Sequence, residues 1–258
     1  MSEVVFVRTR YTYDSYSDFF RLAELSGFPV IYVDEIPESG VHDNVYIVSP
    51  VNGEWNHGIK TDGRVILWQL EYGFDKPEIP GVSEVWVSDS WLAKTIGARH
   101  VPMGSHPLLN DRPGDRHVRR YDVAWLAYSP PRRGTVYTML QEHGLNIAPN
   151  AWGEQRHNIL TQSACMVTAH QLDDFHCMPP LRLALCAAYH LPYISETPFT
   201  IAPFTHDHVL TADYGQLADT VAYWTRRMPE QDLREYGHGL FEYLCIENTF
   251  RKTVERAL

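Results

Sequence analysis

The chain has 258 residues, of which 44% are hydrophobic, and a formal net charge of −10. This size and apolar content allow one large core or two modest ones. The acidity argues against broad electrostatic adhesion to nucleic acid or to an anionic membrane, although an acidic protein can carry a local basic groove. The sequence has no apolar run of about 18 residues and no N-terminal signal-peptide pattern, so we predict a soluble, cytoplasmic protein without membrane insertion.

Five strand-like runs in the first hundred residues are rich in β-branched or aromatic residues: EVVFVRTR, FPVIYVDE, DNVYIVSP, GRVILWQLE and EVWVSDS. Helical patterns over residues 15–27 and 90–97 each end at a glycine. Apolar strands that alternate with helices are typical of a parallel sheet covered on both faces. We therefore predict a Rossmann-like domain over residues 1–106.

After a polar, proline-bearing linker over residues 107–120, the same alternation begins again. Its strand-like and helical segments are YDVAWLAYS, RRGTVYTMLQEHG, LNIAPNAW, EQRHNILTQS, ACMVTAHQ, the helix at residues 180–190 and LPYISE. Two further helical stretches, 214–228 and 230–258, close the chain. The sequence thus predicts an α/β protein with two doubly wound, Rossmann-like domains facing a cleft, and the second domain covers residues 121–258 with the terminal helices.

The four cysteines, Cys165, Cys177, Cys186 and Cys245, have no Cys-x-x-Cys spacing. We interpret them as reduced thiols in a packed interior. The sequence also lacks a G-x-G-x-x-G fingerprint, a P-loop and a G-x-S-x-G elbow, which weighs against nicotinamide redox chemistry, P-loop nucleotide hydrolysis and α/β-hydrolase chemistry.

Ligands of open α/β sheets bind beyond the carboxyl ends of strands, so the residues after each predicted strand are candidates. The segment SPPRR follows YDVAWLAY, and Arg132 and Arg133 stand at the start of the next helix. The helix dipole disfavours cations at the start of a helix, so another interaction must account for these two arginines. Two interpretations stay open: the two guanidinium groups and the helix amides form a diphosphate cradle, or they form a surface arginine pair.

Other strand-end residues have two interpretations each. Arg156 either pairs with Glu154 or reaches the cleft, and His170 is either a structural residue or a binding residue at the end of a strand. The helix entered through Pro180 has free first amides that face the preceding loop, which makes that end attractive to an anion.

No convincing metal site is visible. Asp173 and Asp174 are adjacent, so their side chains point apart, and His206 and His208 have no evident third ligand. We therefore expect no metal.

The N-terminal half offers Arg10, Tyr13 and Asp14 after the first strand and Glu71 after the fourth. A partly desolvated carboxylate in a cleft can act as a general base because its pKa moves toward neutrality. The alternative for Glu71 is a solvated strand end.

The chain resembles nucleotide-sugar glycosyltransferases of the two-Rossmann GT-B type, especially the spore-maturation-like and phage-encoded glycosyltransferase-like families. The segments that carry the resemblance are YDVAWLAYSPPRR, LNIAPNAWGEQR, CMVTAH, PPLRLALCAAYHLPYISE, RVILWQLE and EVWVSDSWLAKTIGARHVPMGSHP. It implies that the sugar-nucleotide donor is bound by Tyr128, Ser129, Arg132, Arg133, Arg156, His170, Asp174, Pro180, Leu181 and Arg182. Many relatives have a Glu, seven residues and a second Glu here; this chain has Asp174 and Arg182, so Arg182 either meets phosphate or supports the domain.

The resemblance also implies a metal-independent transfer of sugar from a nucleoside diphosphate to a hydroxyl acceptor, without a further cofactor. Glu71 and Asp14 are the candidate catalytic residues, and Arg10 and Tyr13 the candidate acceptor contacts. A hydroxymethylated pyrimidine in phage DNA is one acceptor, with the basic segment 111–122 contacting phosphates in a host cytoplasm. The alternative is a non-catalytic sugar-nucleotide-binding or structural protein that keeps the fold, as the substituted second Glu would suggest.

Overall fold

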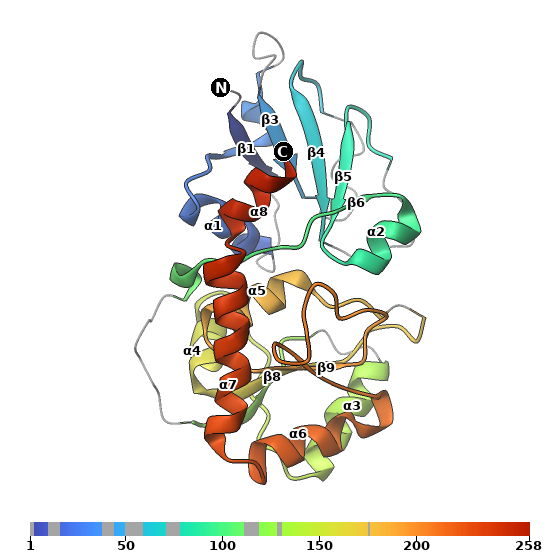
Figure 1. Ribbon diagram of the computed structural model, residues 1–258, viewed down its shortest axis with the longest axis vertical. Helices are drawn as coiled ribbons and strands as arrows, with labels where there is room; N and C mark the ends of the chain where they lie inside the picture. The colour runs from blue at the N-terminus through green and yellow to red at the C-terminus, as the bar shows by residue number, and fades with distance from the viewer. Residues whose placement is uncertain are drawn as a thin grey trace. The chain divides into compact units, whose positions relative to one another are not determined.

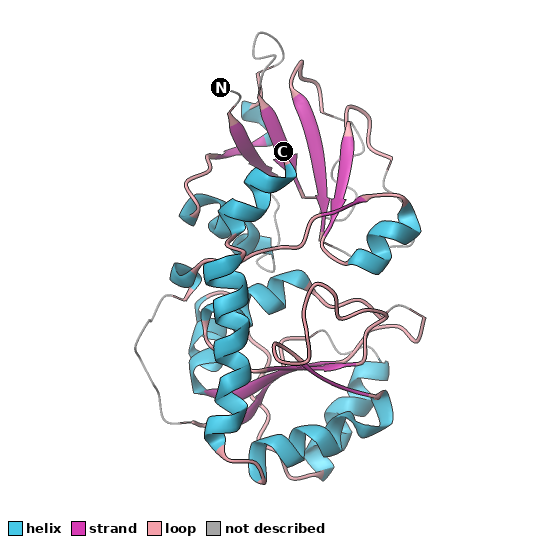
Figure 2. Cartoon of the chain, in the orientation of Figure 1, coloured by secondary structure: helices cyan, strands magenta, loops and turns pink. Residues whose placement is uncertain are grey.

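The computed structural model describes residues 3–9, 16–37, 44–49, 59–70, 78–110, 119–127, 131–174 and 176–258. The chain divides into two compact units, whose elements are labelled in Figure 1. The first unit comprises Met1–Met103, Pro179–Leu181 and Phe250–Leu258, and the second comprises Gly104–Met178 and Arg182–Thr249. Each unit contains a parallel sheet with helices beside it (Figure 2), which confirms the predicted fold class.

The first sheet has the order β2-β1-β3-β4-β5-β6, and all its neighbours pair in parallel. Its strands are β1 (Val4–Arg8), β2 (Val30–Tyr32), β3 (Val45–Val48), β4 (Arg64–Gln69), β5 (Glu84–Val87) and β6 (Arg99–His100). Because β1 lies between β2 and β3, the winding of this sheet reverses at β1. Its helical elements are α1 (Ser17–Leu25), η2 (Val33–Glu35) and α2 (Ser90–Ile96).

Helix α2 shows how local sequence sets the ends of an element. The Asp89 side chain accepts a hydrogen bond from the Leu92 amide at 2.9 Å, which caps the first turn. Gly97 ends the helix with a φ of 64°, a conformation that glycine adopts without steric cost.

The last helix, α8 (Phe250–Ala257), belongs to the first unit. The Phe250 ring stacks on Trp68 with ring centroids 5.5 Å apart and packs against Phe6 and Phe19. This arrangement differs from the expected division, which assigned both terminal helices to residues 121–258. The physical reason is the aromatic core of the first sheet, in which the Phe250 side chain is fully buried.

The second sheet has the order β10-β9-β8-β7, again all parallel. Its strands are β7 (Tyr121–Ala124), β8 (Ser163–Thr168), β9 (Tyr193–Glu196) and β10 (Leu210–Ala212). The expected strand LNIAPNAW is reduced to one bridge between Val123 and Ile147. Pro149 follows two residues later and has no amide hydrogen for a longer ladder. The short strand β10 was not expected from the sequence.

Helices cover both faces of the second sheet. The elements are η3 (Pro107–Leu109), α3 (Pro131–Glu142), α4 (Glu154–Gln162), α5 (Pro180–Ala188), η4 (Tyr214–Gln216), α6 (Leu217–Arg226), α7 (Glu230–Phe241) and the π-helical η5 (Glu242–Glu247). Helices α3 and α6 share a core with one face, which includes Leu140, Val167 and Val221. On the other face, the Cys186 sulfur of α5 lies 3.5 Å from the Met166 sulfur of β8.

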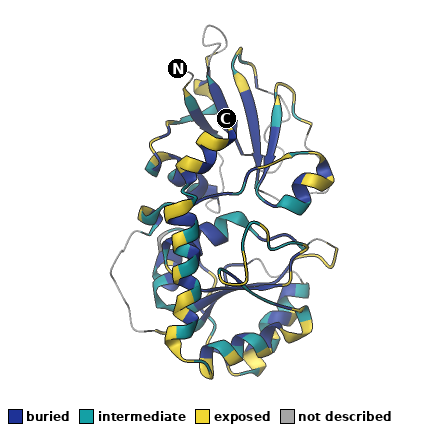
Figure 3. Ribbon diagram, viewed as in Figure 1, coloured by how far each residue is buried: buried dark blue, intermediate teal, exposed yellow. Residues whose placement is uncertain are grey.

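The inner strands of both sheets, among them β3, β4 and β9, are largely buried (Figure 3). All four cysteines are buried and free of disulfides. Among the described residues, no helix has the length and apolar character needed to cross a membrane.

Candidate functional site

The carboxyl edge of the second sheet gathers polar side chains at its reversal point. Val123 of β7 pairs with Ile147 on one side and with Cys165 of β8 on the other, so the winding reverses at β7. Ligands of doubly wound sheets bind at such a point, outside the strand ends. Arg132 follows β7, His170 follows β8, and Glu196 ends β9.

Arg132 lies in the first turn of α3 and donates to four acceptor atoms on three residues. Its Nη1 donates to Glu196 Oε2 at 2.6 Å and to the His170 carbonyl at 3.1 Å, and its Nη2 donates to Glu196 Oε1. Its Nε donates to Asp173 Oδ1. The guanidinium is therefore tied to the ends of both β8 and β9.

Tyr214 completes the surroundings of this guanidinium. The guanidinium carbon lies 4.1 Å from the centre of the Tyr214 ring, within the range of a cation–π interaction. The Tyr214 hydroxyl donates to the Arg132 carbonyl at 3.1 Å. Side chain and backbone of Arg132 are thus both held by the same residue, which restricts the orientation of the guanidinium.

The Arg132–Glu196 pair is charged on both sides at neutral pH. Burial alone would raise the pKa of Glu196, but the hydrogen bonds from Arg132 and from the His170 amide outweigh it, so the pKa lies below its usual value. The hydrogen bond to Glu196 raises the pKa of Arg132, although burial opposes this shift. The pair fixes the position of the Arg132 guanidinium at the sheet edge.

Arg133 behaves differently from its neighbour. It is buried, with 3% of its surface exposed, and its Nε donates to the Ala169 carbonyl at 2.8 Å. The two arginines therefore bond successive carbonyls, those of Ala169 and His170, at the end of β8. This explains why cations stand at the start of α3, and the burial of Arg133 contradicts the interpretation of the two residues as a surface arginine pair. The diphosphate cradle stays a prediction.

His170, His176 and Glu196 place possible ligand atoms within 4.8 Å of one another. The two imidazole rings are stacked, with centroids 4.5 Å apart and planes at 13°, whereas an imidazole binds a metal within its ring plane. Both Glu196 oxygens are already bound to Arg132. Burial lowers the pKa of His170 to about 4, so its ring is neutral at pH 7, and Nε2 lies 3.2 Å from the Thr197 carbonyl. This cluster does not fit a metal ion.

The remaining described candidates lie in α4, in α5 and in the loop after β8. Asp174 is exposed and Arg156 is buried. Pro180 and Leu181 begin α5, followed by Arg182 in the same turn. The Nη1 atom of Arg182 is buried and meets no hydrogen-bond acceptor within the described part of the chain. Six predicted site residues lie outside the described residues: Arg10, Tyr13, Asp14, Glu71, Tyr128 and Ser129.

Sequence reasoning missed Glu196, Asp173 and Tyr214 as members of this cluster. A signal for Glu196 was available, because it is the last residue of the predicted strand LPYISE and so obeys the strand-end rule. Tyr214 follows β10, which the sequence did not predict, and Asp173 was considered only as a metal ligand.

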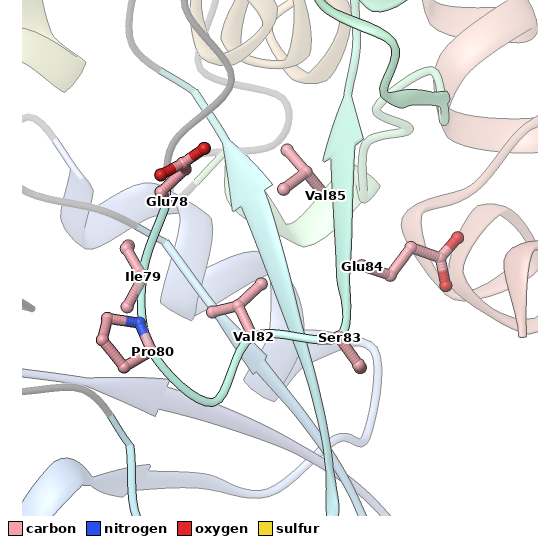
Figure 4. A pocket seen from close by; sticks show the side chains of 7 residues that line it. All are labelled: Glu78, Ile79, Pro80, Val82, Ser83, Glu84 and Val85. Carbon is pink, nitrogen blue, oxygen red and sulfur yellow. The ribbon is translucent and has the colours of Figure 1, made fainter.

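A separate hollow of about 550 Å³ lies in the first unit (Figure 4). Its lining residues are Glu78, Ile79, Pro80, Val82, Ser83, Glu84 and Val85. These residues lead into the amino end of β5, opposite the edge at which parallel sheets bind ligands. Glu84 is paired with Arg64 and Arg99. We therefore do not assign this hollow as the candidate site.

No family model matches the sequence, and no curated protein matches it. Solved structures do match. AviGT4, a glycosyltransferase involved in avilamycin A biosynthesis, has a TM-score of 0.65 and 12% identity, covering 100% of this chain and 96% of that chain. An Escherichia coli trehalose-6-phosphate synthase bound with UDP-2-fluoro glucose has a TM-score of 0.63 and 8% identity, covering 99% and 98%. T4 phage beta-glucosyltransferase has a TM-score of 0.56 and 12% identity, covering 99% and 97%. The chain has the fold of GT-B glycosyltransferases.

Proposed function

We propose that this chain is a glycosyltransferase that moves a sugar from a nucleoside-diphosphate sugar to a hydroxyl acceptor. The observation that carries the proposal is the fixed guanidinium of Arg132 at the reversal point of the second sheet. A positive group in this place suits a diphosphate, and the fold is shared with glycosyltransferases that are described with UDP-sugars.

The donor diphosphate would lie against Arg132 and the first turn of α3. Backbone N–H groups of a first helical turn have no acceptor within the helix, and they favour anions together with the helix dipole. The buried Nη1 of Arg182, at the start of α5, supports a second anion contact because a buried donor without an acceptor is costly. Tyr128 and Ser129 stay proposed donor contacts.

The chemical step needs these positive groups most when the glycosidic bond breaks. The acceptor oxygen forms a bond to the anomeric carbon, the bond from that carbon to the diphosphate oxygen breaks, and the electron pair leaves with the diphosphate. Groups that stabilise the growing negative charge lower the barrier. In this scheme Arg132 and the helix amides supply the positive charge, so no metal ion or other cofactor takes part.

The acceptor proton passes to a carboxylate of the first unit. We propose Glu71 as this base, with Asp14 as the second candidate and Arg10 and Tyr13 as acceptor contacts. A strand-end carboxylate that is partly desolvated has a pKa suited to proton transfer near neutral pH. All four residues follow strands β1 and β4 in the sequence.

A hydroxymethylated pyrimidine in phage DNA is our proposed acceptor, within the host cytoplasm. It is supported by the fold shared with T4 phage beta-glucosyltransferase, which is described as a DNA-modifying enzyme. Because the chain carries a net charge of −10, DNA would have to be met by a local basic group such as the segment 111–122. The affinity for DNA should then decrease steeply with added salt, and an affinity that does not change with salt concentration would exclude this acceptor.

A thermal-shift panel of sugar nucleotides and free nucleoside diphosphates tests the donor. A ligand at about 100 times its dissociation constant adds roughly 2.7 kcal/mol to the free energy of unfolding. We expect a shift with one donor family, and we expect Arg132→Ala to abolish it. The control is Arg234→Ala, which removes an exposed arginine of α7 and should keep the shift. No shift with any nucleotide would overturn the proposal.

Turnover separates an enzyme from a protein that only binds the donor. Glu71→Ala should keep the thermal shift and stop release of nucleoside diphosphate from the sugar nucleotide in the presence of acceptor. Full turnover in Glu71→Ala would exclude Glu71 as the base. A wild-type protein that binds donor but releases no diphosphate with any hydroxyl acceptor would be a non-catalytic binder.

A further inference from the structure

The guanidinium of Arg132 has two edges that can each donate a pair of hydrogen bonds. Both donors of one edge have acceptors, and, among the described residues, only one donor of the other edge does. Its end-on edge, Nη1 and Nη2, binds both oxygens of Glu196, which is buried. Its side-on edge consists of Nε–H and the second hydrogen of Nη2. Asp173 covers Nε with one oxygen, Oδ1. Within the described part of the chain, the second Nη2 hydrogen has no acceptor.

The two carboxylates differ in how firmly they are held. The Glu196 side chain is 3% exposed and also accepts from the His170 amide at 2.9 Å. The Asp173 side chain is 91% exposed and makes a single contact to this guanidinium. Exposed ion pairs are weak because water competes for both partners. A ligand can therefore displace Asp173 far more easily than Glu196.

The side-on edge suits a phosphate better than it suits Asp173. A guanidinium offers two parallel N–H groups at this edge, and a phosphate can accept from both with two of its oxygens. Asp173 accepts from one. A phosphate with more negative charge and a second hydrogen bond would thus replace Asp173 with a gain in interaction.

The loop that carries Asp173 can stay in place during this exchange. The His176 Nε2 lies 2.9 Å from the Asp173 carbonyl oxygen, and the His176 ring stacks on His170. Phe199 stacks on the other side of His176, with centroids 5.2 Å apart, and its amide donates to the His176 carbonyl at 2.8 Å. The Asp173 carbonyl is held by His176, so rotation of the Asp173 side chain is enough to uncover the side-on edge of Arg132.

We propose that Asp173 occupies the place of a donor phosphate on the side-on edge of Arg132 and competes with the donor for it. The inference rests on the proposed function, because it assumes that the ligand carries a phosphate. In the free protein the Asp173 carboxylate accepts from Nε of Arg132; in the complex the phosphate takes its place and Asp173 turns into solvent. Asp173 therefore lowers the affinity for donor and product.

The test is titration calorimetry of the full chain with UDP. Asp173→Asn removes the competing charge and should lower the dissociation constant for UDP about fivefold, the size expected for an exposed ion pair. Asp173→Ala must change affinity in the same direction. Glu235→Gln removes the same charge from an exposed position of α7 and should leave the UDP affinity unchanged. Because Asp173 is exposed, these variants are expected to fold normally.

The outcomes separate this inference from the proposed function. If wild type binds UDP and either Asp173 variant binds it equally or more weakly, Asp173 does not compete and the inference is wrong, while the proposed function stands. If Glu235→Gln increases the affinity for UDP as much as Asp173→Asn does, the increase comes from the change in net charge, and the inference is also wrong. If neither wild type nor the variants bind UDP, any other nucleoside diphosphate or pyrophosphate, both proposals fail together.

Discussion

Arg132 and Glu196 form a two-point ion pair that joins the first turn of α3 to the last residue of β9. The residues are 64 positions apart in the sequence. Their contact sets the direction of the guanidinium at the reversal point of the second sheet, and Tyr214 and the end of β8 hold it from other sides. A group held in this way stabilises a developing charge without having to reorganise first.

Breaking this pair should destabilise the protein strongly. Glu196→Gln leaves the largely buried Arg132 cation without its counter-charge, and we expect a loss of about 3 kcal/mol in the free energy of unfolding. Urea unfolding of the full chain measures it. Glu230→Gln breaks the exposed pair with Arg234 on α7 and should cost at most about 0.5 kcal/mol. Equal costs for the two variants would contradict the importance of burial here.

The free energy of unfolding should decrease as the pH is lowered through the range in which histidines titrate, and His170 is the reason. Burial lowers the pKa of His170 to about 4, below the ordinary 6.5, so the folded state favours the neutral ring. This contribution is fully present above pH 6.5 and is lost as the pH falls toward about 4, by about 3 kcal/mol in total. The lowered pKa of Glu196 adds a further loss below about 4.5.

The comparison between wild type and His170→Gln isolates this histidine. Urea unfolding at several pH values between about 7 and 4.5 should give a shallower slope in the variant, whatever its absolute stability. Parallel curves for the two proteins would show that His170 keeps an ordinary pKa.

The C-terminal helix should stabilise the first unit. Phe250→Ala removes a fully buried ring from the aromatic core around Trp68 and should cost about 3–5 kcal/mol. The matched control is Leu258→Ala, which shortens a side chain that is 42% exposed and should change stability by less than about 0.5 kcal/mol. Thermal unfolding monitored by tryptophan fluorescence reports the change. A Phe250→Ala protein as stable as wild type would place the helix outside this core.

Helix α7 packs so closely against the residues that follow α5 that one glycine is required. A Cβ at Gly237 would fall inside contact distance of the His190 carbonyl oxygen, a backbone atom that cannot move alone. We expect Gly237→Ala to destabilise by about 2 kcal/mol or more. Gly134→Ala in α3 meets open space and should be neutral or stabilising by about 0.5–1 kcal/mol. Chemical denaturation compares them, and a neutral Gly237→Ala would mean that α7 and the segment after α5 separate easily.

Local sequence patterns predicted most elements well because their causes are local. Helices α1 and α2 end where Gly27 and Gly97 adopt positive φ, and strands β1 to β5 of the first sheet coincide with runs rich in β-branched or aromatic residues. The two-residue strand β6 has no such run and was not predicted. The three-residue strand β10 lacked such a run and was missed. Pairing of Ile147 was reduced to one bridge because a neighbouring proline ends the ladder.

The sequence by itself determined two alternating β and α series and the strand-end position of Arg132, since both depend on periodicity and on neighbours in the chain. Only the tertiary structure decided that Glu196, Asp173 and Tyr214 meet at Arg132, because strand order brings distant strand ends to one edge. It also decided that Arg133 turns inward and that Phe250 returns to the first unit. These placements depend on which interior space a side chain can fill and on which buried acceptors still need a donor. Both are properties of the packed fold and not of any one segment.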